Sequence, residues 1–386
     1  MKILAFHFAH DANACVLENE EIIYYSKEEY FTGRKRDGNP YKLLEYCQQF
    51  KPFDAVIFTT PTGNYYHQEP VEKYAVKTLC DNDENIFLNW SFRHHFFHAT
   101  LAFYNSGFDK SYNVVIDSNG ALFADPDYNI LLGREHESIF YLEWPSSAEI
   151  IIQNTPSWYG ITLIYALVSE LIGLTQLDSG KTMGLSSYGK IDKSLPNFFK
   201  NINQLGLPID IDKFYYPSSQ RNLIKDNYVK KFKDLEYYHE MYKETKHIIE
   251  DIFKRKHKLK NHNELTEKNY QPYADIAKKV QKESEDAVIE FILKYCDFNK
   301  CKNITLSGGY ALNCLNNYRL LHELPTDVNL FVEPNADDSG ISIGAAKYYY
   351  YHNTKNKIKK SAMSIYNADI TPDYNIVNDN VETQVG

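Results

Sequence analysis

One pattern of strands and turns occurs twice in this chain, and it constrains the fold more than any other feature. Near the start, apolar runs at residues 3–8 and 14–17 flank a polar turn that carries Asp11, and a third apolar run follows a second turn. Residues 112–138 repeat this order of runs and turns, and Asp117 stands where Asp11 stands. Each copy predicts three antiparallel strands. The repeat favours two similar lobes with a cleft between them; the alternative is a chance likeness between two meanders.

Helical patterns separate these strands, so the expected class is α/β. Residues 41–50 are amphipathic, residues 155–174 are apolar nearly all round and predict a buried helix, and residues 273–296 keep a 3.6-residue period. The last of these segments leads into a strand, a glycine turn and the start of another helix, at residues 302–313.

The chain has 386 residues, more than one hydrophobic core usually organises, so two lobes are expected. We predict that the first lobe spans residues 1–110 and the second residues 111–353. Residues 191–270 are polar, charged and rich in Lys and Tyr, which predicts an insertion in the second lobe. Residues 354–386 are polar and lack a period, which predicts a tail or linker.

Composition and charge exclude several classes of protein. Apolar residues make up 43% of the chain, enough for real cores, and the net charge of −9 argues against a dedicated nucleic-acid binder. The six cysteines have no framework spacing, which favours reduced core thiols over disulfides. The N-terminus does not match a signal peptide, and no run of about 18 apolar residues occurs. We therefore expect a cytoplasmic protein without a membrane span.

Three turns carry residues suited to binding a nucleotide. Asp11 and Asp117 each follow a strand, Gly120 comes just after Asp117, and Gly308 and Gly309 form a turn between a strand and a helix. Glycines let the backbone approach a phosphate, and N–H groups of a following helix point at the anion. Carboxylates at strand ends can hold a metal ion. Each turn alone is weak evidence, because a Gly-Gly pair is more often a simple turn, but together they favour a nucleotide in the cleft.

A fourth stretch, residues 177–190, is predicted to form a glycine-rich loop that carries Gly180 and Lys181. It is not a P-loop, because the spacing of that motif is absent. Either the loop closes over a phosphate or acyl phosphate, or it is a flexible loop with an exposed lysine.

His94 and His98 stand four positions apart in a segment that predicts a helix. Four residues rotate by about 400°, so both rings lie on one face, where they could hold a metal ion. The zinc-protease motif is excluded, since phenylalanines fill the interior and no glutamate is available as a base. A third ligand would decide between a metal site and a histidine-rich face that binds nothing. The best candidates are Asp337 and Asp338, just before a glycine and a small-residue helix start.

Five stretches, in order along the chain, carry a resemblance to a known family. They are HDANACVLENEEIIYYSKEEYFTGRKRD, HHFFHATLAFYNSGFDKSYNVVID, SGKTMGLSSYGK, LSGGYALNCLNNYRL and VEPNADDSGISIGAAKYYY. The chain resembles the NodU/CmcH-type O-carbamoyltransferases, which include enzymes that complete tobramycin and cephamycin antibiotics, and more distantly the TsaD-type tRNA-threonylcarbamoyl transferases. The resemblance implies an actin-like fold of two duplicated RNase H-like lobes with a nucleotide cleft between them.

The resemblance also implies roles for individual residues. A divalent metal, iron(II) in this family, would be bound by His94, His98 and Asp338, and not by His95 or Asp337. Contacts to the nucleotide or carbamoyl-adenylate are expected from residues in and beside the turns: Asn13, Asp117, Gly120, Gly180, Lys181, Gly308, Gly309 and Asn313.

The reaction implied by the family is attack of an acceptor hydroxyl on carbamoyl-adenylate, which is made from carbamoyl phosphate and ATP, with AMP as the leaving group. His10 and Asp11 face the cleft in this interpretation, and either is a candidate general base; we prefer His10. Carbamoyltransferases of this family carry a second, YrdC-like domain that makes carbamoyl-adenylate, and residues 354–386 resemble only the linker that leads to it. We therefore expect a YrdC-like domain or partner to supply the activated donor.

The sequence does not specify the acceptor hydroxyl. Sugars, antibiotics and nucleosides all fit the family. A basic run at residues 253–262 is either a solvated helix face or a contact for a phosphate-bearing acceptor, such as a hydroxymethylated nucleotide or DNA. Two other classes stay open: a sugar-kinase-like ATP phosphotransferase of the same superfamily, and a non-catalytic nucleotide-binding subunit. A homodimer is compatible with the sequence, and no membrane partner is expected.

Overall fold

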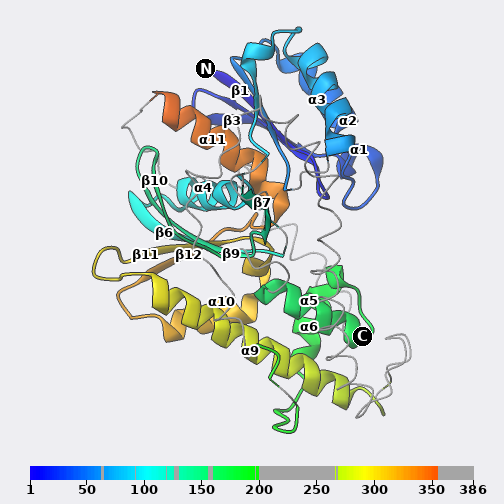
Figure 1. Ribbon diagram of the computed structural model, residues 1–386, viewed down its shortest axis with the longest axis vertical. Coiled ribbons are helices and arrows are strands. Elements are labelled where there is room, and N and C mark those ends of the chain that lie inside the picture. The colour runs from blue at the N-terminus through cyan, green and yellow to red at the C-terminus, as the bar shows by residue number, and fades with distance from the viewer. Residues whose placement is uncertain are drawn as a thin grey trace, which may run out of the picture.

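The computed structural model of the protein describes residues 1–61, 65–91, 93–118, 120–125, 130–154, 160–195, 197–199, 266 and 268–354. Most of the predicted insertion at residues 191–270, the basic run within it and the tail beyond residue 354 lie outside the described residues. The described part contains two five-stranded sheets, a two-stranded sheet and the helices that cover them (Figure 1).

The first sheet comes from the N-terminal copy of the repeat. Its strands are β1 (Lys2–His7), β2 (Asn13–Glu18), β3 (Glu21–Lys27), β4 (Ala55–Thr59) and β5 (Phe87–Asn89). They lie in the order β3-β2-β1-β4-β5. The first three pair antiparallel, and β4 and β5 extend the sheet parallel to β1. The predicted three-stranded meander at the start of the chain is thereby confirmed.

The second sheet has the same plan. Its strands are β6 (Lys110–Ile116), β9 (Glu137–Glu143), β10 (Ser147–Asn154), β11 (Asn303–Ser307) and β12 (Asn329–Val332). They lie in the order β10-β9-β6-β11-β12, with β6, β9 and β10 antiparallel and β11 and β12 parallel to β6. Position by position this is the order of the first sheet. The unit is duplicated, and the predicted actin-like, two-lobed α/β fold is confirmed.

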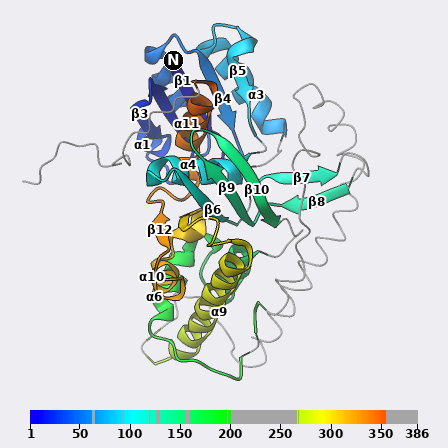
Figure 2. The same cartoon turned by 90° about the vertical axis from the view of Figure 1, so that its left-hand side faces the viewer.

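The second copy differs from its prediction in one respect. After Asp117 the chain forms a separate hairpin of β7 (Leu122–Asp125) and β8 (Ile130–Arg134) before it returns to the sheet as β9. Figure 2 shows this hairpin projecting beside the second sheet. The prediction that residues 112–138 supply three strands of one sheet was therefore wrong. Alternating apolar residues predict a strand, but they do not say which sheet it joins.

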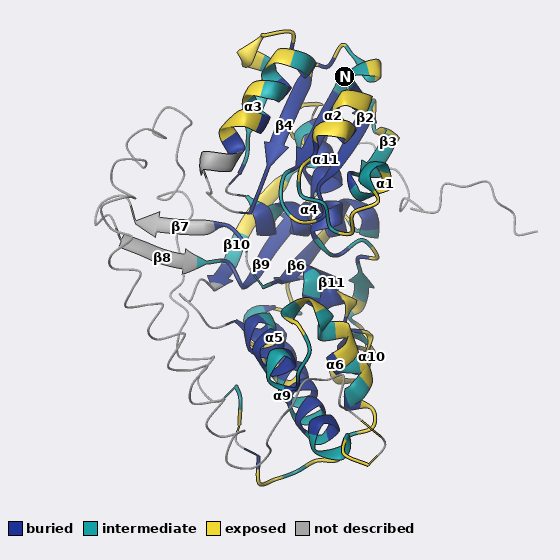
Figure 3. Ribbon diagram, turned by 90° about the vertical axis from the view of Figure 1, so that its right-hand side faces the viewer, coloured by how far each residue is buried: buried dark blue, intermediate teal, exposed yellow. Residues whose placement is uncertain are grey.

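Helices cover the outer face of each sheet (Figure 3), where the buried strands lie between helical layers. α2 (Tyr41–Cys47) and α3 (Tyr65–Leu79) pack on the first sheet, and α5 (Ile161–Leu171) and α9 (Gln271–Tyr295) pack on the second. The helices predicted around α2 and α9 are confirmed, and the buried helix predicted at residues 155–174 is α5. Two further short helices are α1 (Glu29–Thr32) and α10 (Cys314–Glu323).

A central layer of two helices joins the lobes. α4 (His94–Ser106) packs on β6 and β11 of the second sheet, α11 (Ile341–Thr354) packs on β1 and β2 of the first, and the two helices pack on each other. α11 thus lies on the first sheet, although the predicted boundary assigns residues 111–353 to the second lobe. The two helices approach closely at Gly344, where a Cβ atom would lie 2.2 Å from the carbonyl oxygen of Phe97.

Residues 177–190 form a helix over much of the stretch where a loop was predicted. α6 (Ser179–Ser186) follows a short 3₁₀ turn that is closed by a capping box between Thr175 and Asp178. A Cβ atom on Gly180 would meet nothing within 4 Å, so no close contact requires glycine at this position. The loop prediction was wrong because glycine weakens a helix without forbidding it where caps and packing support the turn.

The cysteines and the helix lengths bear on two further expectations. All six cysteines lie in the described residues and none of them is disulfide-bonded there; five are buried, as predicted for core thiols, and Cys314 is exposed. Among the described residues, no single helix is long and apolar enough to cross a membrane. α5 and the helical segment that ends with α6 pass that test together, as a pair bent by 101°.

A buried lysine links the two helices of the central layer by a hydrogen bond. The Nζ atom of Lys347 on α11 donates to Oδ1 of Asn105 on α4 (2.6 Å), and Nδ2 of Asn105 donates to Oε2 of Glu333 (3.0 Å). All three side chains are buried. Burial lowers the pKa of Lys347 to about 8, although the nearby charge of Glu333 opposes the shift.

We expect Lys347 to make the free energy of unfolding depend on pH above neutrality. Its folded-state pKa lies below the ordinary value of 10.5, so the unfolded chain holds this proton more tightly. Stability should therefore rise as the pH rises from about 8 to about 10.5. In Lys347→Met this gain, on the order of 1–3 kcal/mol, should be absent. Urea unfolding of both proteins at about pH 7.5 and about pH 9.5 measures it, and parallel pH curves would contradict the assignment.

Candidate functional site

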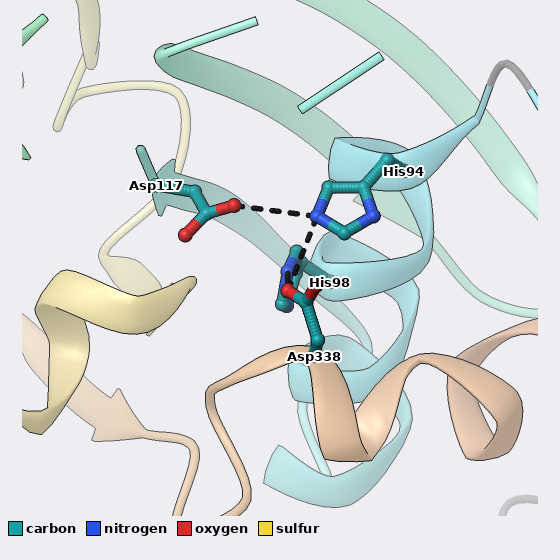
Figure 4. A group of neighbouring side chains, drawn as sticks. All are labelled: His94, His98, Asp117 and Asp338. Carbon is teal, nitrogen blue, oxygen red and sulfur yellow. Dashed lines mark hydrogen bonds and ion pairs between the residues drawn. The ribbon is translucent and has the colours of Figure 1, made fainter. Parts of the chain in front are cut away.

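Two histidines of α4 and an aspartate from the far end of the chain meet between the lobes (Figure 4). α4 begins at His94, and His98 follows one turn later on the same face. Asp337 caps the short turn that Asp338 opens, because its carboxylate accepts the backbone N–H of Ser339 (3.1 Å). The Nε2 atoms of His94 and His98 lie 3.3 and 3.5 Å from Oδ1 of Asp338. It is therefore Asp338, and not Asp337, that joins the histidines.

Asp117 joins this cluster from the end of β6. Its Oδ2 atom lies 3.3 Å from Nε2 of His94, and its Oδ1 atom accepts the backbone N–H of Gly309 (3.2 Å). One ligand atom from each of His94, His98, Asp117 and Asp338 lies within 4.8 Å of the others. The family resemblance implied a nucleotide contact for Asp117 and did not include it among the metal ligands. Its position at a strand end of the repeat was the signal for a carboxylate that could hold a metal ion.

Burial and charge make the cluster suited to a divalent cation. All four side chains are buried. Burial lowers the pKa of His94, but the charge of Asp338 and the contact with Asp117 outweigh it and raise the pKa to about 10. The Nε2 atom of His98 is buried without a hydrogen-bond partner. Two imidazoles and two carboxylates are ordinary ligands of iron(II) and zinc, and a cation would satisfy that nitrogen, so these residues fit the expected metal.

The turn after β1 brings His10 and Asp11 to the edge of this cluster. Nδ1 of His10 lies 3.1 Å from Oδ2 of Asp11, and Nε2 of His10 lies 3.5 Å from Oδ2 of Asp338. Nζ of Lys27 donates to Oδ1 of Asp11 (2.7 Å). Burial raises the pKa of Asp11, but His10 and Lys27 outweigh it and lower the pKa to about 2. The His10 side chain is 57% exposed, so its imidazole is open to solvent beside an ionised carboxylate.

Three of the predicted glycines border the cluster. Gly308 has a φ of +85°, and a Cβ atom there would lie 2.4 Å from a carbonyl oxygen of β6, so glycine is required. The next residue, Gly309, donates its N–H to Asp117. A Cβ atom on Gly120 would lie 2.6 Å from the side chain of Glu135. The turn at Gly308 and Gly309 therefore places backbone next to the Asp117 carboxylate, whereas Gly120 lets the turn after β6 pack against Glu135.

Both asparagines predicted to contact the nucleotide have partners within the protein. Nδ2 of Asn13 donates to the backbone carbonyl of Asp338 (3.0 Å), and its Oδ1 accepts the backbone N–H of Ser342 (3.3 Å). Asn313 caps α10 and exchanges two hydrogen bonds of 3.0 Å with Gln281. Asn13 thus fixes the segment that carries Asp338.

Gly180 and Lys181 lie on α6, where Nζ of Lys181 is 2.8 Å from Oδ1 of Asp178. Arg36 of the first lobe reaches this region, because its Nη2 donates to the carbonyl oxygen of Leu177 (3.3 Å). A phosphate contact by Gly180 or Lys181 stays a prediction.

Two residues that no sequence motif singled out, His7 and Glu135, also touch the site. Nε2 of His7 lies 3.6 Å from Oδ2 of Asp338. Oε2 of Glu135 accepts the backbone N–H groups of His95 (3.2 Å) and Ala121 (2.8 Å), which joins the start of α4 to the turn after β6. His7 lies near the same predicted strand end as His10 and Asp11, and this grouping could have indicated a role in the site. The local sequence around Glu135 contains no such indication.

Comparison with known families decides what kind of chain carries this site. The family described as "Carbamoyltransferase N-terminus" matches residues 61–347, well over half of the chain, and the match includes α4, Asp117 and Asp338. The chain belongs to this carbamoyltransferase family. The resemblance drawn from the five sequence stretches is thereby confirmed.

Individual relatives of the chain are distant and longer. The chain is similar to an uncharacterized protein of Methanocaldococcus jannaschii, with 26% identity over 89% of this chain and 56% of the relative. It is also similar to the nodulation protein NolO of Bradyrhizobium diazoefficiens, with 25% identity over 66% of this chain and 37% of the relative. The chain therefore spans about half the length, or less, of these two curated relatives.

Solved structures resemble the chain more weakly. The HypF structure from T. kodakarensis has 13% identity and a TM-score of 0.48, over 91% of this chain and 48% of that one. A dehydratase activator from Clostridium difficile, solved with bound ADPNP, has 11% identity and a TM-score of 0.42, over 94% of this chain and 100% of that one. The assignment of the fold rests instead on the matching strand orders of the two sheets.

Proposed function

We propose that these lobes transfer a carbamoyl group from carbamoyl-adenylate to an acceptor hydroxyl. The buried cluster of His94, His98, Asp117 and Asp338, bordered by the exposed His10, carries this proposal, because it occurs in a chain of a carbamoyltransferase family. The hydroxyl oxygen attacks the carbamoyl carbon, the bond from that carbon to the phosphate oxygen breaks, and AMP leaves. The hydroxyl proton must pass to a base of the site.

The cation proposed for this cluster is iron(II). The residues that would hold it are His94, His98 and Asp338, with Asp117 as a further carboxylate ligand. Two histidines and one carboxylate form the ligand set of many iron(II) sites. Bound there, the cation would supply positive charge that stabilises the developing charge on the phosphate and carbamoyl oxygens.

His10 is the proposed general base. Asp11 orients its imidazole through Nδ1, as the third group of a nucleophile–base arrangement does. The hydrogen bond with Asp11 and the charge of Asp338 raise the pKa of His10 to about 9. The proposal therefore requires His10 to lose its proton in the loaded site, where positive charge at the cluster opposes the charge of Asp338.

The nucleotide is proposed to lie against the turns that border the cluster. Gly309 offers partly exposed backbone for a phosphate, while the buried Gly120 and Gly308 shape the turns by letting the chain pack closely. A YrdC-like domain or partner would make the carbamoyl-adenylate from carbamoyl phosphate and ATP. The acceptor is proposed to be a sugar, an antibiotic, or a nucleotide such as a hydroxymethylated base, free or in DNA.

A sugar-kinase-like phosphotransferase of the same fold is the second candidate, and a non-catalytic nucleotide-binding subunit is the third. Phosphoryl transfer from ATP needs no buried pair of histidines beside the phosphate. The His94–His98 pair and its two carboxylates therefore favour carbamoyl transfer over both.

The test supplies preformed carbamoyl-adenylate to residues 1–386 and measures release of AMP, first with water and then with a panel of nucleosides and sugars. We expect AMP release that rises with a suitable hydroxyl, and a carbamoylated product by mass spectrometry. His10→Asn should lower the rate by about 10²–10⁴-fold. ATP and carbamoyl phosphate alone should give no product until a YrdC-like protein is added. Failure with carbamoyl-adenylate would contradict the proposal, and a phosphorylated acceptor formed from ATP would favour the kinase.

A further inference from the structure

The two oxygens of Asp338 face different sets of histidines. Oδ1 lies toward the α4 pair, 3.3 Å from Nε2 of His94 and 3.5 Å from Nε2 of His98. Oδ2 lies toward the first lobe, 3.6 Å from Nε2 of His7. His7 is the last residue of β1, and its side chain is fully buried. It has no part in the mechanism proposed above.

A hydrogen bond to Thr59 determines which nitrogen of His7 carries the proton. Nδ1 of His7 lies 2.9 Å from Oγ1 of Thr59, and that hydroxyl donates to the carbonyl oxygen of Phe6 (3.2 Å). A hydroxyl has one proton to donate, so Oγ1 accepts from Nδ1–H of His7. In the neutral ring, the other nitrogen carries no proton. The Nε2 atom then presents a lone pair.

That lone pair faces the carboxylate of Asp338. A separation of 3.6 Å is too long for a hydrogen bond, and Nε2 of His7 is buried without a hydrogen-bond partner. An unpartnered acceptor beside an ionised Asp338 costs stability. A cation between the two groups removes that cost, because each would donate a lone pair to it.

The spacing between His7 and Asp338 also fits two ligands of one ion, with His7 beside the group of four whose ligand atoms all lie within 4.8 Å of one another. With metal–ligand bonds of about 2.0–2.2 Å, two ligands at angles of about 90–120° lie about 3.0–3.7 Å apart. The contacts of Asp338 with His94 and His98, at 3.3 and 3.5 Å, fall in this range. So does the contact of Asp338 with His7, at 3.6 Å.

We propose that His7 is a further ligand of the cation, through Nε2, so that the site has three imidazoles, from His7, His94 and His98. This inference rests on the cation proposed above for the cluster. In the proposed cation site, Thr59 acts as a positioning residue. Its hydroxyl holds the proton of His7 on Nδ1 and keeps Nε2 free to bind. The first lobe thereby contributes a ligand from β1, and cation binding links both lobes.

The test uses cobalt(II) alone as the probe, added to the full chain. X-ray absorption should count one imidazole fewer in His7→Leu than in the wild type. The affinity for cobalt(II) in His7→Leu should fall by at least about a hundredfold, since even the loss of an outer partner costs about 10–100-fold. His95→Gln is the matched control, because His95 is buried one position from His94 but bonds Ser138 (2.8 Å); it should keep the wild-type count and affinity. Circular dichroism checks that each variant is folded.

Variants of Thr59 test whether His7 binds the cation or only fills space beside it. Thr59→Val should weaken cobalt(II) binding by about 10–100-fold and leave the imidazole count unchanged, while Thr59→Ser, which keeps the hydroxyl, should bind as the wild type does. An unchanged imidazole count in His7→Leu would overturn the inference and leave the cation site standing. A wild-type chain that binds no cobalt(II) would overturn the cation site, and the inference with it.

Discussion

Replacing both His94 and His98 by alanine is expected to abolish cation binding and to lower carbamoyl transfer by at least about a hundredfold, because charge stabilisation by a metal is worth several kcal/mol. The two imidazoles are buried, face one carboxylate and contribute half of the four-residue cluster. Metal analysis of the purified variant after exposure to iron(II), together with AMP release from carbamoyl-adenylate, measures both effects.

His95→Ala is the control for this pair. His95 is buried on the same helix, but its ring bonds Ser138 and is not among the four ligand residues. It should keep the cation. Removing the α4 pair leaves the buried carboxylates of Asp117 and Asp338 without their imidazole partners, which costs stability, so near-UV circular dichroism should accompany the assay. Full metal occupancy in a folded double variant would contradict the assignment of the site.

Gly344→Val is expected to destabilise the protein by about 3 kcal/mol or more and to weaken cation binding at least about tenfold. A Cβ atom at Gly344 would lie 2.2 Å from the carbonyl oxygen of Phe97, which is backbone and cannot turn aside. α11 would have to move away from α4. Since Asp338 precedes α11 and the histidines of the proposed cation site lie on α4, the same movement would draw the proposed ligands apart. Chemical denaturation and metal titration measure the two effects.

Gly184→Ala is the matched substitution. Gly184 lies within α6, and a Cβ atom there would meet nothing within 4 Å. Alanine should stabilise this helix by about 0.5–1 kcal/mol, because it restricts the unfolded chain more than glycine does. If Gly344→Val proved as stable as the wild type, the close crossing of α4 and α11 would not be what positions Asp338.

The sequence by itself determined the plan of the protein. Two copies of a strand–turn pattern predicted two lobes, and the two sheets have matching strand orders. The spacing of His94 and His98 placed both rings on one helix face, as observed. These features follow from local periodicity, which depends only on residues a few positions apart. The five stretches that carry the family resemblance are likewise visible in sequence order alone.

The family resemblance grouped His94, His98 and Asp338, but only the tertiary structure decided which further residues lie beside them. Asp117 and His7 were assigned elsewhere or left without a role, yet both lie beside the α4 histidines and Asp338. The chain after Asp117 leaves the sheet as a hairpin, and α11 returns to the first lobe. These outcomes depend on contacts between segments hundreds of residues apart, such as the one that glycine permits between Gly344 and Phe97. A local pattern fixes the shape of a helix or strand, but packing between distant elements fixes which side chains meet.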